Sequence, residues 1–229
     1  MHHITNPTEK TSVLANLRAL LPNRQLRLDE ALRLAELQAN RLLMLRGATD
    51  TPISSGIVTE LPGIGVDYDI DMPASGSSDW DSRHRRWVIT LRASEPDTRH
   101  RFTLLHEYKH IIDHGHAGIV VNIDGLTQWR PAAETVADYF AACVLMPKRL
   151  LKAAYFSGTQ TVEALAELFD VSRQATCIRL DQLGISREVD LKPPTHIDHP
   201  AARSLARRSY YYRTLSDNRQ SKTSLEISA

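Results

Sequence analysis

The sequence predicts an α+β fold in which a small, mostly antiparallel sheet packs on one central helix and a helical pair follows. Three observations lead to this prediction. Two short β-rich segments, residues 66–72 and 87–91, precede a helical pattern over residues 101–114. A second long helical pattern covers residues 131–146, and two shorter ones occupy residues 161–183. Strands that come together in the sequence and helices that are grouped after them are typical of the α+β class.

The composition is that of an ordinary globular protein. Of the 229 residues, 42% are hydrophobic and 24% are charged. The formal net charge of +1 excludes a globally basic protein that coats nucleic acid. No apolar run approaches about 18 residues, so we expect no membrane span. Two cysteines make no disulfide framework, so we expect a cytoplasmic protein.

Changes in composition divide the chain into four predicted segments. Residues 1–54 are an N-terminal helical segment, whose clear helix starts with Asp29 as its N-cap and stops at Gly47. Residues 55–150 are the core, with both strands and both long helices. Residues 151–188 contain the helical pair, and the polar residues 189–229 are expected to be a flexible tail.

The strand at residues 66–72 is expected at an edge of the sheet, because apolar and polar residues alternate along it. Its side chains expected to face the core are Val66, Tyr68, Ile70 and Met72. The next residues, 73–86, are rich in Ser, Gly, Asp and Arg. They therefore predict a loop that leads to the second strand.

The central helix carries His106-Glu107-Tyr108-Lys109-His110, which matches the pattern H-E-x-x-H. Residues i and i+4 of a helix lie on one face, so both imidazoles can reach one metal ion. Glu107 is close enough to take a proton from a water that the metal activates, without binding the metal itself. Between a strand and a helix that carries acidic residues, this motif predicts a metal site and a zincin-like fold.

A catalytic zinc ion needs a third protein ligand, and two residues compete for that position. Glu134 lies 24 residues beyond His110, and Asp138 follows it at i+4 on the same helix face. The glutamate can bind zinc while the aspartate accepts the free ring N–H of a ligand histidine. His116 is the alternative, as in H-E-x-x-H-x-x-G-x-x-H, but Asp113 stands where that pattern has its glycine. We therefore favour Glu134.

Other histidines near the motif are not expected to bind the metal. His114 follows His110 at i+4, but it is turned by about 80° from the face of His106 at about 3.6 residues per turn. We expect it to have a structural role at the helix end. His84 and His100 have polar neighbours in the sequence and are expected at the surface.

The two long helices resemble those of the ImmA/IrrE family of metallopeptidases. The resemblance is carried by the segments from Arg101 to His110 and from Glu134 to Pro147, and it covers roughly residues 55–185. The chain departs from the family at Lys109, where a small residue is usual. We therefore expect this face of the helix to be more exposed here.

The resemblance implies a zinc-dependent endopeptidase with one Zn²⁺ per chain. It makes His106, His110 and Glu134 the zinc ligands, Glu107 the general base, and Asp138 the partner of a ligand histidine. Members of the family cleave a cognate helix-turn-helix repressor and so relieve repression, for example of genes on mobile elements. A protein substrate of this kind is the expected partner. In such sites a peptide can add as an extended strand beside the sheet edge.

Residues 161–184 indicate a second possible function, because they look like a DNA-binding helix-turn-helix with Asp170 in place of the usual turn glycine. The side chains that could face a groove are Arg173, Gln174, Thr176 and Arg179. Two Arg against four Asp and Glu give this segment a net charge of −2, which would repel phosphates. The charge thus argues against direct DNA binding. The alternative is a non-catalytic, zinc-containing regulator that binds DNA or a protein through this pair.

Overall fold

The structure, a computed structural model, describes residues 12–116 and 129–185. The chain divides into two compact units, Met1–Pro147 and Lys148–Ala229. The fold is α+β, as predicted, and the described residues form a three-stranded sheet and eight helices. A search of these helices for a segment able to span a membrane finds no candidate. The tail predicted over residues 189–229 lies outside the described part of the chain.

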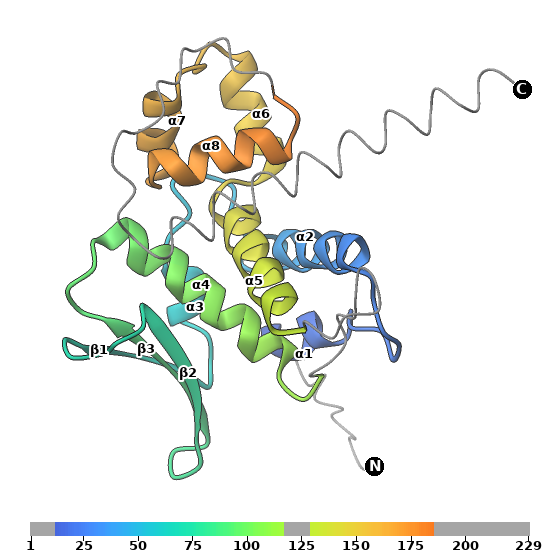
Figure 1. Ribbon diagram of the computed structural model, residues 1–229, viewed down its shortest axis with the longest axis vertical. Helices are drawn as coiled ribbons and strands as arrows, with labels where there is room; N and C mark the ends of the chain where they lie inside the picture. Colours follow the sequence, from blue (N-terminus) through green and yellow to red (C-terminus); the bar gives the residue numbers. More distant parts are fainter. Residues whose placement is uncertain (1–11, 117–128, 186–229) are drawn as a thin grey trace, which may run out of the picture. The chain divides into compact units, whose positions relative to one another are not determined.

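The sheet has the strand order β1–β3–β2, with β3 in the middle (Figure 1). β1 (Ile64–Asp69) runs parallel to β3 (Arg86–Arg92), and β2 (Gly76–Asp81) runs antiparallel to it. The small sheet is therefore mixed, with β1 and β2 at its edges. Every second side chain of β3 is buried, namely Trp87, Ile89 and Leu91.

The sequence prediction was wrong in two details of the sheet. β2 lies inside residues 73–86, which were expected to form a loop, because a strand at a sheet edge tolerates the polar sequence Gly-Ser-Ser-Asp-Trp-Asp. β1 is an edge strand as expected, but it ends at Asp69, and the residues expected to face the core include Tyr68, which is 61% exposed, and Ile70, which lies just beyond the strand and is 71% exposed. The short helix α3 (Gly56–Thr59) contacts β1, and the ring of Tyr68 also lies edge-on to His100 of the following helix, with centroids 5.4 Å apart.

The first unit is layered around one central helix (Figure 1). α4 (Asp97–Asp113) contacts β2 and β3 on one side and α5 (Trp129–Leu145) on the other. α5 in turn contacts α2 (Leu28–Leu45). Both long helices of the predicted core are therefore present, and α4 begins before the predicted start at Arg101. This arrangement places the H-E-x-x-H helix between the sheet and the helix that carries Glu134.

α2 buries one apolar stripe along its length and ends at the predicted glycine. Its buried stripe residues are Leu28, Ala31, Leu32, Ala35, Ala39 and Leu42. Gly47 has a φ of +62° and donates its N–H to the Met44 carbonyl, while the Ala48 N–H reaches the Leu43 carbonyl. These two bonds satisfy the last carbonyl groups of the helix, and the positive φ favours glycine.

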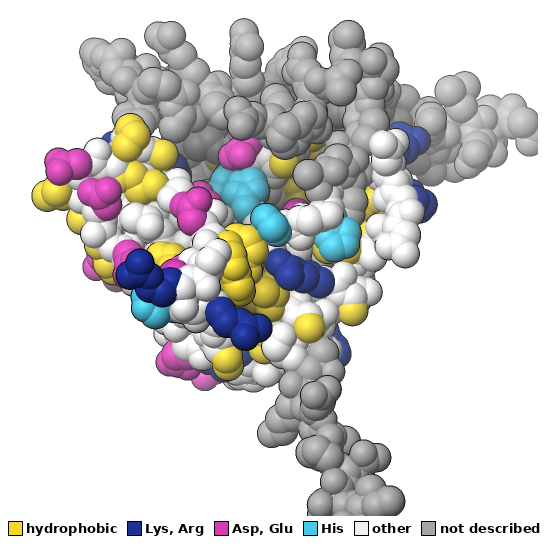
Figure 2. Space-filling model, turned by 90° about the horizontal axis from the view of Figure 1, so that it is seen from below, with side chains coloured by type: hydrophobic (Ala, Val, Ile, Leu, Met, Phe, Trp, Pro, Cys, Tyr) yellow, Lys and Arg dark blue, Asp and Glu magenta, His cyan; other side chains and the backbone are white. Residues whose placement is uncertain are grey.

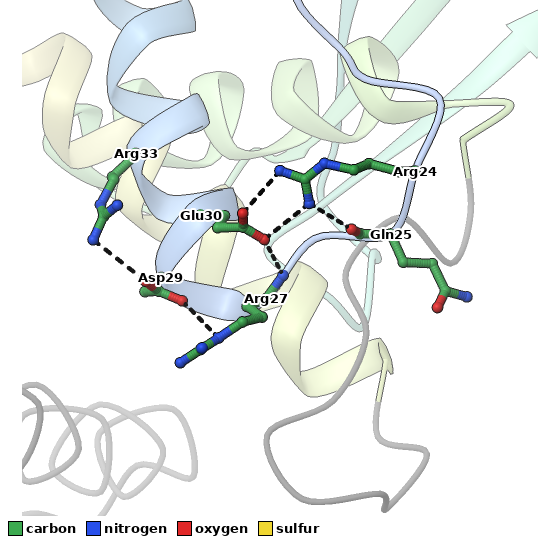
Figure 3. Close-up of polar contacts among 6 residues, drawn as sticks. All are labelled: Arg24, Gln25, Arg27, Asp29, Glu30 and Arg33. Atoms are coloured by element: carbon green, nitrogen blue, oxygen red, sulfur yellow. Dashed lines mark hydrogen bonds and ion pairs between the residues drawn. The ribbon is translucent and has the colours of Figure 1, made fainter.

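A network of charges lies at the start of α2 (Figure 3). Glu30 accepts a hydrogen bond from the backbone N–H of Arg27 at 2.9 Å and others from the Arg24 guanidinium at 2.8 and 3.1 Å. The hydrogen bonds from Arg24 make the largest contribution to lowering the pKa of Glu30, and the bond from the Arg27 backbone adds to it, so that the pKa is about 2. The prediction of Asp29 as the N-cap was wrong, because the N-cap is Arg27. Asp29 lies in the first turn of α2, 3.4 Å from the Arg33 guanidinium.

The shorter helix α1 (Val13–Arg18) joins the N-terminal part of the first unit to α4. Arg18 donates a hydrogen bond to the backbone carbonyl of Ile111 at 2.7 Å, in the last turn of α4. A cation at the carboxyl end of a helix satisfies an unpaired carbonyl and interacts favourably with the helix dipole. This bond therefore supports the end of the helix that carries His106 and His110.

The second unit is described from Lys148 to Ile185 and consists of helices. α6 (Lys148–Phe156) was not predicted, whereas α7 (Val162–Phe169) and α8 (Arg173–Gln182) are the predicted helical pair. α6 contacts α7, and α7 contacts α8.

The turn between α7 and α8 has the geometry that the sequence predicts. Asp170 is in the left-handed region, with φ 49° and ψ 58°. The N–H of Val171 reaches the Ala166 carbonyl at 3.0 Å, which ends α7. The Ser172 hydroxyl accepts the Ala175 N–H at 3.1 Å and so caps the start of α8.

Candidate metal centre

α4 and α5 bring together three side chains that could hold a metal ion: His106, His110 and Glu134. One possible ligand atom from each lies within 4.8 Å of the other two. Nε2 of His106 is 3.1 Å from Nε2 of His110 and 3.2 Å from Oε2 of Glu134. Nε2 of His110 is 3.5 Å from Oε1 of Glu134. The structure therefore gathers the three residues that the sequence singles out, although Glu134 lies 24 residues beyond His110 in the sequence.

Asp138 orients one of these imidazoles. It lies one turn after Glu134 on α5, and its Oδ1 is 2.8 Å from Nδ1 of His106. A hydrogen bond from Nδ1 to the carboxylate leaves the lone pair on Nε2, which is the atom that faces the other two candidate ligands. Asp138 thus sets the ring in the orientation and tautomer that metal binding requires.

The donor set fits a zinc ion. Two imidazole nitrogens and one carboxylate oxygen are common zinc ligands, and catalytic sites with three protein ligands keep a fourth position for water or substrate. Two nitrogens that are each about 2.0–2.1 Å from one tetrahedral ion lie about 3.3 Å apart. The observed 3.1 Å between His106 Nε2 and His110 Nε2 is close to that separation.

The surroundings of His110 favour its neutral form. Burial lowers its pKa, the neighbouring His106 imidazole lowers it further, and the carboxylates of Glu134 and Glu107 act against both. A neutral imidazole has a lone pair to give to a metal, whereas a protonated one has none. The direction of the pKa shift therefore suits metal binding at neutral pH.

Glu107 lies beside the candidate ligands and against the first residue of β2. It is 9% exposed. A Cβ added to Gly76 would lie 3.1 Å from Cγ of Glu107 and 2.4 Å from Cγ2 of Thr103. The close approach of β2 to α4 therefore requires a glycine at this position. Sequence reasoning missed this contact because it treated the segment as a loop.

His116, the alternative third ligand, does not belong to the group of described side chains that could hold a metal ion. Gly115 has a φ of +85° and turns the chain after α4, and the His116 N–H bonds to the Asp113 carbonyl at 2.9 Å. His114 ends α4, as predicted, with its ring centroid 4.7 Å from that of Trp87.

The structure agrees with the prediction for His84 but not with that for His100. His84 is largely exposed and pairs with Asp81 at 2.6 Å. The side chain of His100 is only 14% exposed, and its Nε2 lies 2.9 Å from the backbone carbonyl of Arg92. A backbone acceptor at the end of β3 accounts for its burial, and the local sequence does not reveal such a partner.

Lys109 is buried, although the family pattern led us to expect an exposed face there. Its side chain is 2% exposed, and its Nζ lies 2.5 Å from Oδ1 of Asp113 one turn later on α4. Burial lowers the pKa of Lys109, and Asp113 opposes this effect. The expectation was wrong because a carboxylate at i+4 supplies the partner that a buried ammonium group requires.

Two of the four α8 side chains that could have faced a DNA groove are buried. Thr176 and Arg179 have no exposed surface. Arg173 is exposed but forms an ion pair with Glu163, and Gln174 is exposed as well. The described surface of α8 therefore offers fewer contacts to a nucleic acid than its sequence indicates.

Comparisons with known proteins agree with the resemblance noted in the sequence. A solved structure described as a Mycobacterium tuberculosis transcriptional regulator is similar in fold, with a TM-score of 0.54 at 17% sequence identity. The similarity covers 80% of this chain and 53% of that one, so the chain spans about half the length of that regulator. Among curated proteins, none matches the sequence. Residues 68–181 match the family described as the IrrE N-terminal-like domain, peptidase M78. This match spans β2, β3, both helices of the candidate metal centre and most of the α7–α8 pair, and it shows that the chain belongs to the IrrE-like peptidase M78 family.

Proposed function

We propose that this protein is a zinc-dependent endopeptidase that holds one zinc ion with His106, His110 and Glu134. The observation that carries the proposal is the meeting of three possible ligand atoms within 4.8 Å of one another, with the carboxylate of Glu107 near enough to influence the pKa of His110. Membership of the peptidase M78 family supports a metallopeptidase-like or regulatory role.

The chain's own residues divide the chemistry between them. When bound, zinc would lower the pKa of a coordinated water towards neutrality and polarise the peptide carbonyl. Glu107 would take a proton on a carboxylate oxygen and later give it to the amine that leaves. Asp138 keeps the His106 ring turned with Nε2 towards the ligand group, and burial of Glu107 limits competing contacts with solvent.

The edge of β2 would hold the substrate. A strand at a sheet edge has unpaired backbone groups, to which an extended peptide can add with main-chain hydrogen bonds. Because Gly76 lies against Glu107, a peptide that runs along this edge passes the general base. The contact between β2 and α4 thus supports an endopeptidase that binds its substrate as a strand.

We propose a helix-turn-helix repressor of transcription as the substrate. The resemblance to the ImmA/IrrE family is the basis of this choice, and the similar structure described as a transcriptional regulator supports a role in the control of transcription. Cleavage of the repressor would relieve repression of its target genes.

The zinc site is tested by elemental analysis of three purified proteins. Wild type and His116→Ala should each contain about one zinc per chain, because His116 is outside the ligand group. Glu134→Ala should lose most of its zinc. Loss of zinc from His116→Ala with retention by Glu134→Ala would contradict the ligand assignment.

The peptidase activity is tested by comparing wild type with Glu107→Gln. Each zinc-loaded protein is incubated with the same library of tryptic peptides from a bacterial lysate, and new termini are identified by mass spectrometry. Wild type should create new termini, whereas Glu107→Gln should create none while it retains zinc and its circular dichroism spectrum. Equal cleavage by both proteins would show that Glu107 is not the base.

The proposed substrate class needs an experiment in cells. Wild type or Glu107→Gln is expressed in the native host, and truncated proteins are sought by labelling of new amino termini. A DNA-binding repressor that is truncated only in the presence of wild type would support the proposal. Truncation of unrelated proteins alone would contradict it.

The geometry of the α7–α8 pair supports one alternative, a regulator that acts without cleavage. The left-handed Asp170 and the capping Ser172 produce a turn of the helix-turn-helix kind. In that case Glu107→Gln would keep its full effect on transcription of the target genes. Under the peptidase proposal, the same variant would lose this effect.

A further inference from the structure

We propose that Trp80, at the open edge of β2, forms a subsite that selects peptides with a large apolar side chain. This inference rests on the proposed function, because it assumes that a peptide pairs with β2. It adds a substrate preference to that function. The proposal follows from the register of the sheet, the position of Gly76 and the aromatic contacts of Trp80.

The register shows which backbone groups of β2 are open. The Arg92 N–H donates to the Ser75 carbonyl at 3.0 Å, so this pair is hydrogen-bonded across the β2–β3 ladder. In antiparallel strands, hydrogen-bonded and non-hydrogen-bonded pairs alternate. Because Ser77, Asp79 and Asp81 follow Ser75 at even steps, they are the residues that bond to β3. The backbone groups of Gly76, Ser78 and Trp80 point away from β3, to the edge at which β2 has no partner strand among the described residues.

The same alternation places Gly76 and Trp80 on one face of the strand. Side chains of residues i and i+4 of a strand point to the same side, and four residues span about 13 Å at about 3.3 Å each. A Cβ on Gly76 would point at Thr103 and Glu107, so this is the face that carries α4. A peptide paired with β2 near Glu107 would therefore present another residue to Trp80, on the same face and four positions along.

Trp80 has the features of a preformed contact for such a residue. Its side chain is 50% exposed, and its ring lies edge-on to Trp87, with centroids 5.5 Å apart. Trp87 is 8% exposed and lies in turn 4.7 Å from the ring of His114. One side of Trp80 is therefore supported by a fixed aromatic neighbour, while the other is open to solvent. Figure 2 shows a hydrophobic patch beside histidine side chains on one face of the molecule.

The chemistry of the occupant follows from that of the tryptophan. Aromatic rings bury a large apolar area and bind other aromatic or large aliphatic side chains better than small or charged ones. The preferred residues should be Phe, Tyr, Trp, Leu and Met. Gly76 lies against Glu107, and Trp80 lies on the same face of the same strand. The side chain that contacts Trp80 should therefore belong to the peptide substrate.

Tyr68 provides a matched control. It is an aromatic residue on the other edge strand, β1, and it is 61% exposed. β3 separates β1 from β2, so Tyr68 does not face a peptide bound along β2. Replacing it removes a similar exposed ring from the sheet without changing the proposed subsite.

The test measures binding, which does not require cleavage. Zinc-loaded full-length Glu107→Gln is immobilised alone and with Trp80→Ala, Trp80→Phe or Tyr68→Ala as a second change. Tryptic peptides from a bacterial lysate are passed over each protein, and the retained peptides are identified by mass spectrometry. We expect about tenfold enrichment of peptides with the preferred residues on Glu107→Gln, a typical discrimination for one apolar contact.

The enrichment should persist with Tyr68→Ala and Trp80→Phe and should disappear with Trp80→Ala. Equal enrichment with Trp80→Ala, or retention of no peptide by Glu107→Gln, would overturn the subsite. Digestion of the same library by wild type separates this result from the proposed function. If wild type cleaves peptides but Trp80→Ala does not change which peptides are retained, only the subsite is overturned. If retention depends on Trp80 but wild type cleaves no peptide, only the proposed peptidase activity is overturned.

Discussion

Asp138 on α5 and His106 on α4 meet at 2.8 Å, through the one ring nitrogen of His106 that does not face the candidate ligands. This contact joins the two helices of the metal centre independently of any ion. It also decides which nitrogen of the ring carries the proton, and therefore which one can bind a metal.

Removing this carboxylate should weaken zinc binding. We expect Asp138→Ala to lower the affinity by about 10–100-fold, the usual effect of losing the partner of a ligand histidine. Competition with a fluorescent zinc chelator measures this change. Glu36→Gln is the control. Glu36 also contacts α5, since it accepts a hydrogen bond from Tyr139 at 3.3 Å, but it belongs to α2 and not to the candidate metal centre. Equal affinities for Asp138→Ala and wild type would contradict the orienting effect.

A methyl group at Gly76 should separate β2 from α4. We expect Gly76→Ala to lower the free energy of unfolding by about 1–3 kcal/mol, as in other overpacked sites, and to reduce peptide cleavage. The clash is with Cγ2 of Thr103, at 2.4 Å from the added Cβ. Adding Thr103→Ser removes that methyl group and should restore part of both losses. Urea unfolding and cleavage of the peptide library measure the two effects. A Gly76→Ala variant with the stability and the cleavage activity of wild type would refute the close contact.

The two partners of the Lys109–Asp113 pair should differ in their response to mutation. Asp113→Asn leaves the ammonium group buried without a charged partner, which should lower the free energy of unfolding by about 1–3 kcal/mol. The loss should be smaller than for a fully buried pair, because Asp113 is partly solvated. Lys109→Met replaces the buried cation by an apolar chain of similar length and should cost less than about 1 kcal/mol. Urea unfolding of both variants tests the order. A larger loss for Lys109→Met would mean that the ammonium group makes a net favourable contribution.

The network at the start of α2 should stabilise the protein only above acidic pH. Hydrogen bonds from Arg24 and from the Arg27 backbone lower the pKa of Glu30 from 4.5 to about 2. A group with a lower pKa in the folded state stabilises that state above its unfolded pKa, and the contribution is lost as the pH falls through the folded pKa.

Wild type should therefore be more stable than Glu30→Gln above about pH 4.5, and the difference should shrink towards about pH 2. Midpoints of urea unfolding at about pH 7, 5 and 3 measure this trend, with Glu36→Gln as the control for removing one charge from α2. A difference that grows on acidification would have the wrong sign and would contradict the pKa shift.

Helical spacing made the candidate ligands of the metal centre predictable from the sequence. The i+4 relation placed His106 and His110 on one face, and the same relation between Glu134 and Asp138 indicated both a ligand and its supporting residue. The distance of 24 residues between the two pairs did not hinder the prediction, because each helix had a clear pattern of its own.

The features that sequence reasoning missed depend on contacts between segments. β2 is polar, and its place at the edge depends on its pairing with β3 and on the absence of a side chain at Gly76. His100 and Lys109 read as surface residues until their partners, a carbonyl of Arg92 and the carboxylate of Asp113, are known. Local patterns record periodicity well, but they do not record which buried polar atom will find a partner.

The candidate metal ligands on α4 and α5 have a consequence for the stability of the folded chain. An ion held by both His110 and Glu134 would crosslink the chain and close a loop of 24 residues. In the chain-entropy account, a crosslink that closes a loop of this length stabilises the folded state by roughly 3 kcal/mol. Because α5 also packs on α2, opening this loop would loosen the N-terminal helices as well. The supply of zinc in the cell would then govern how long the protein resists degradation, as well as whether it can react.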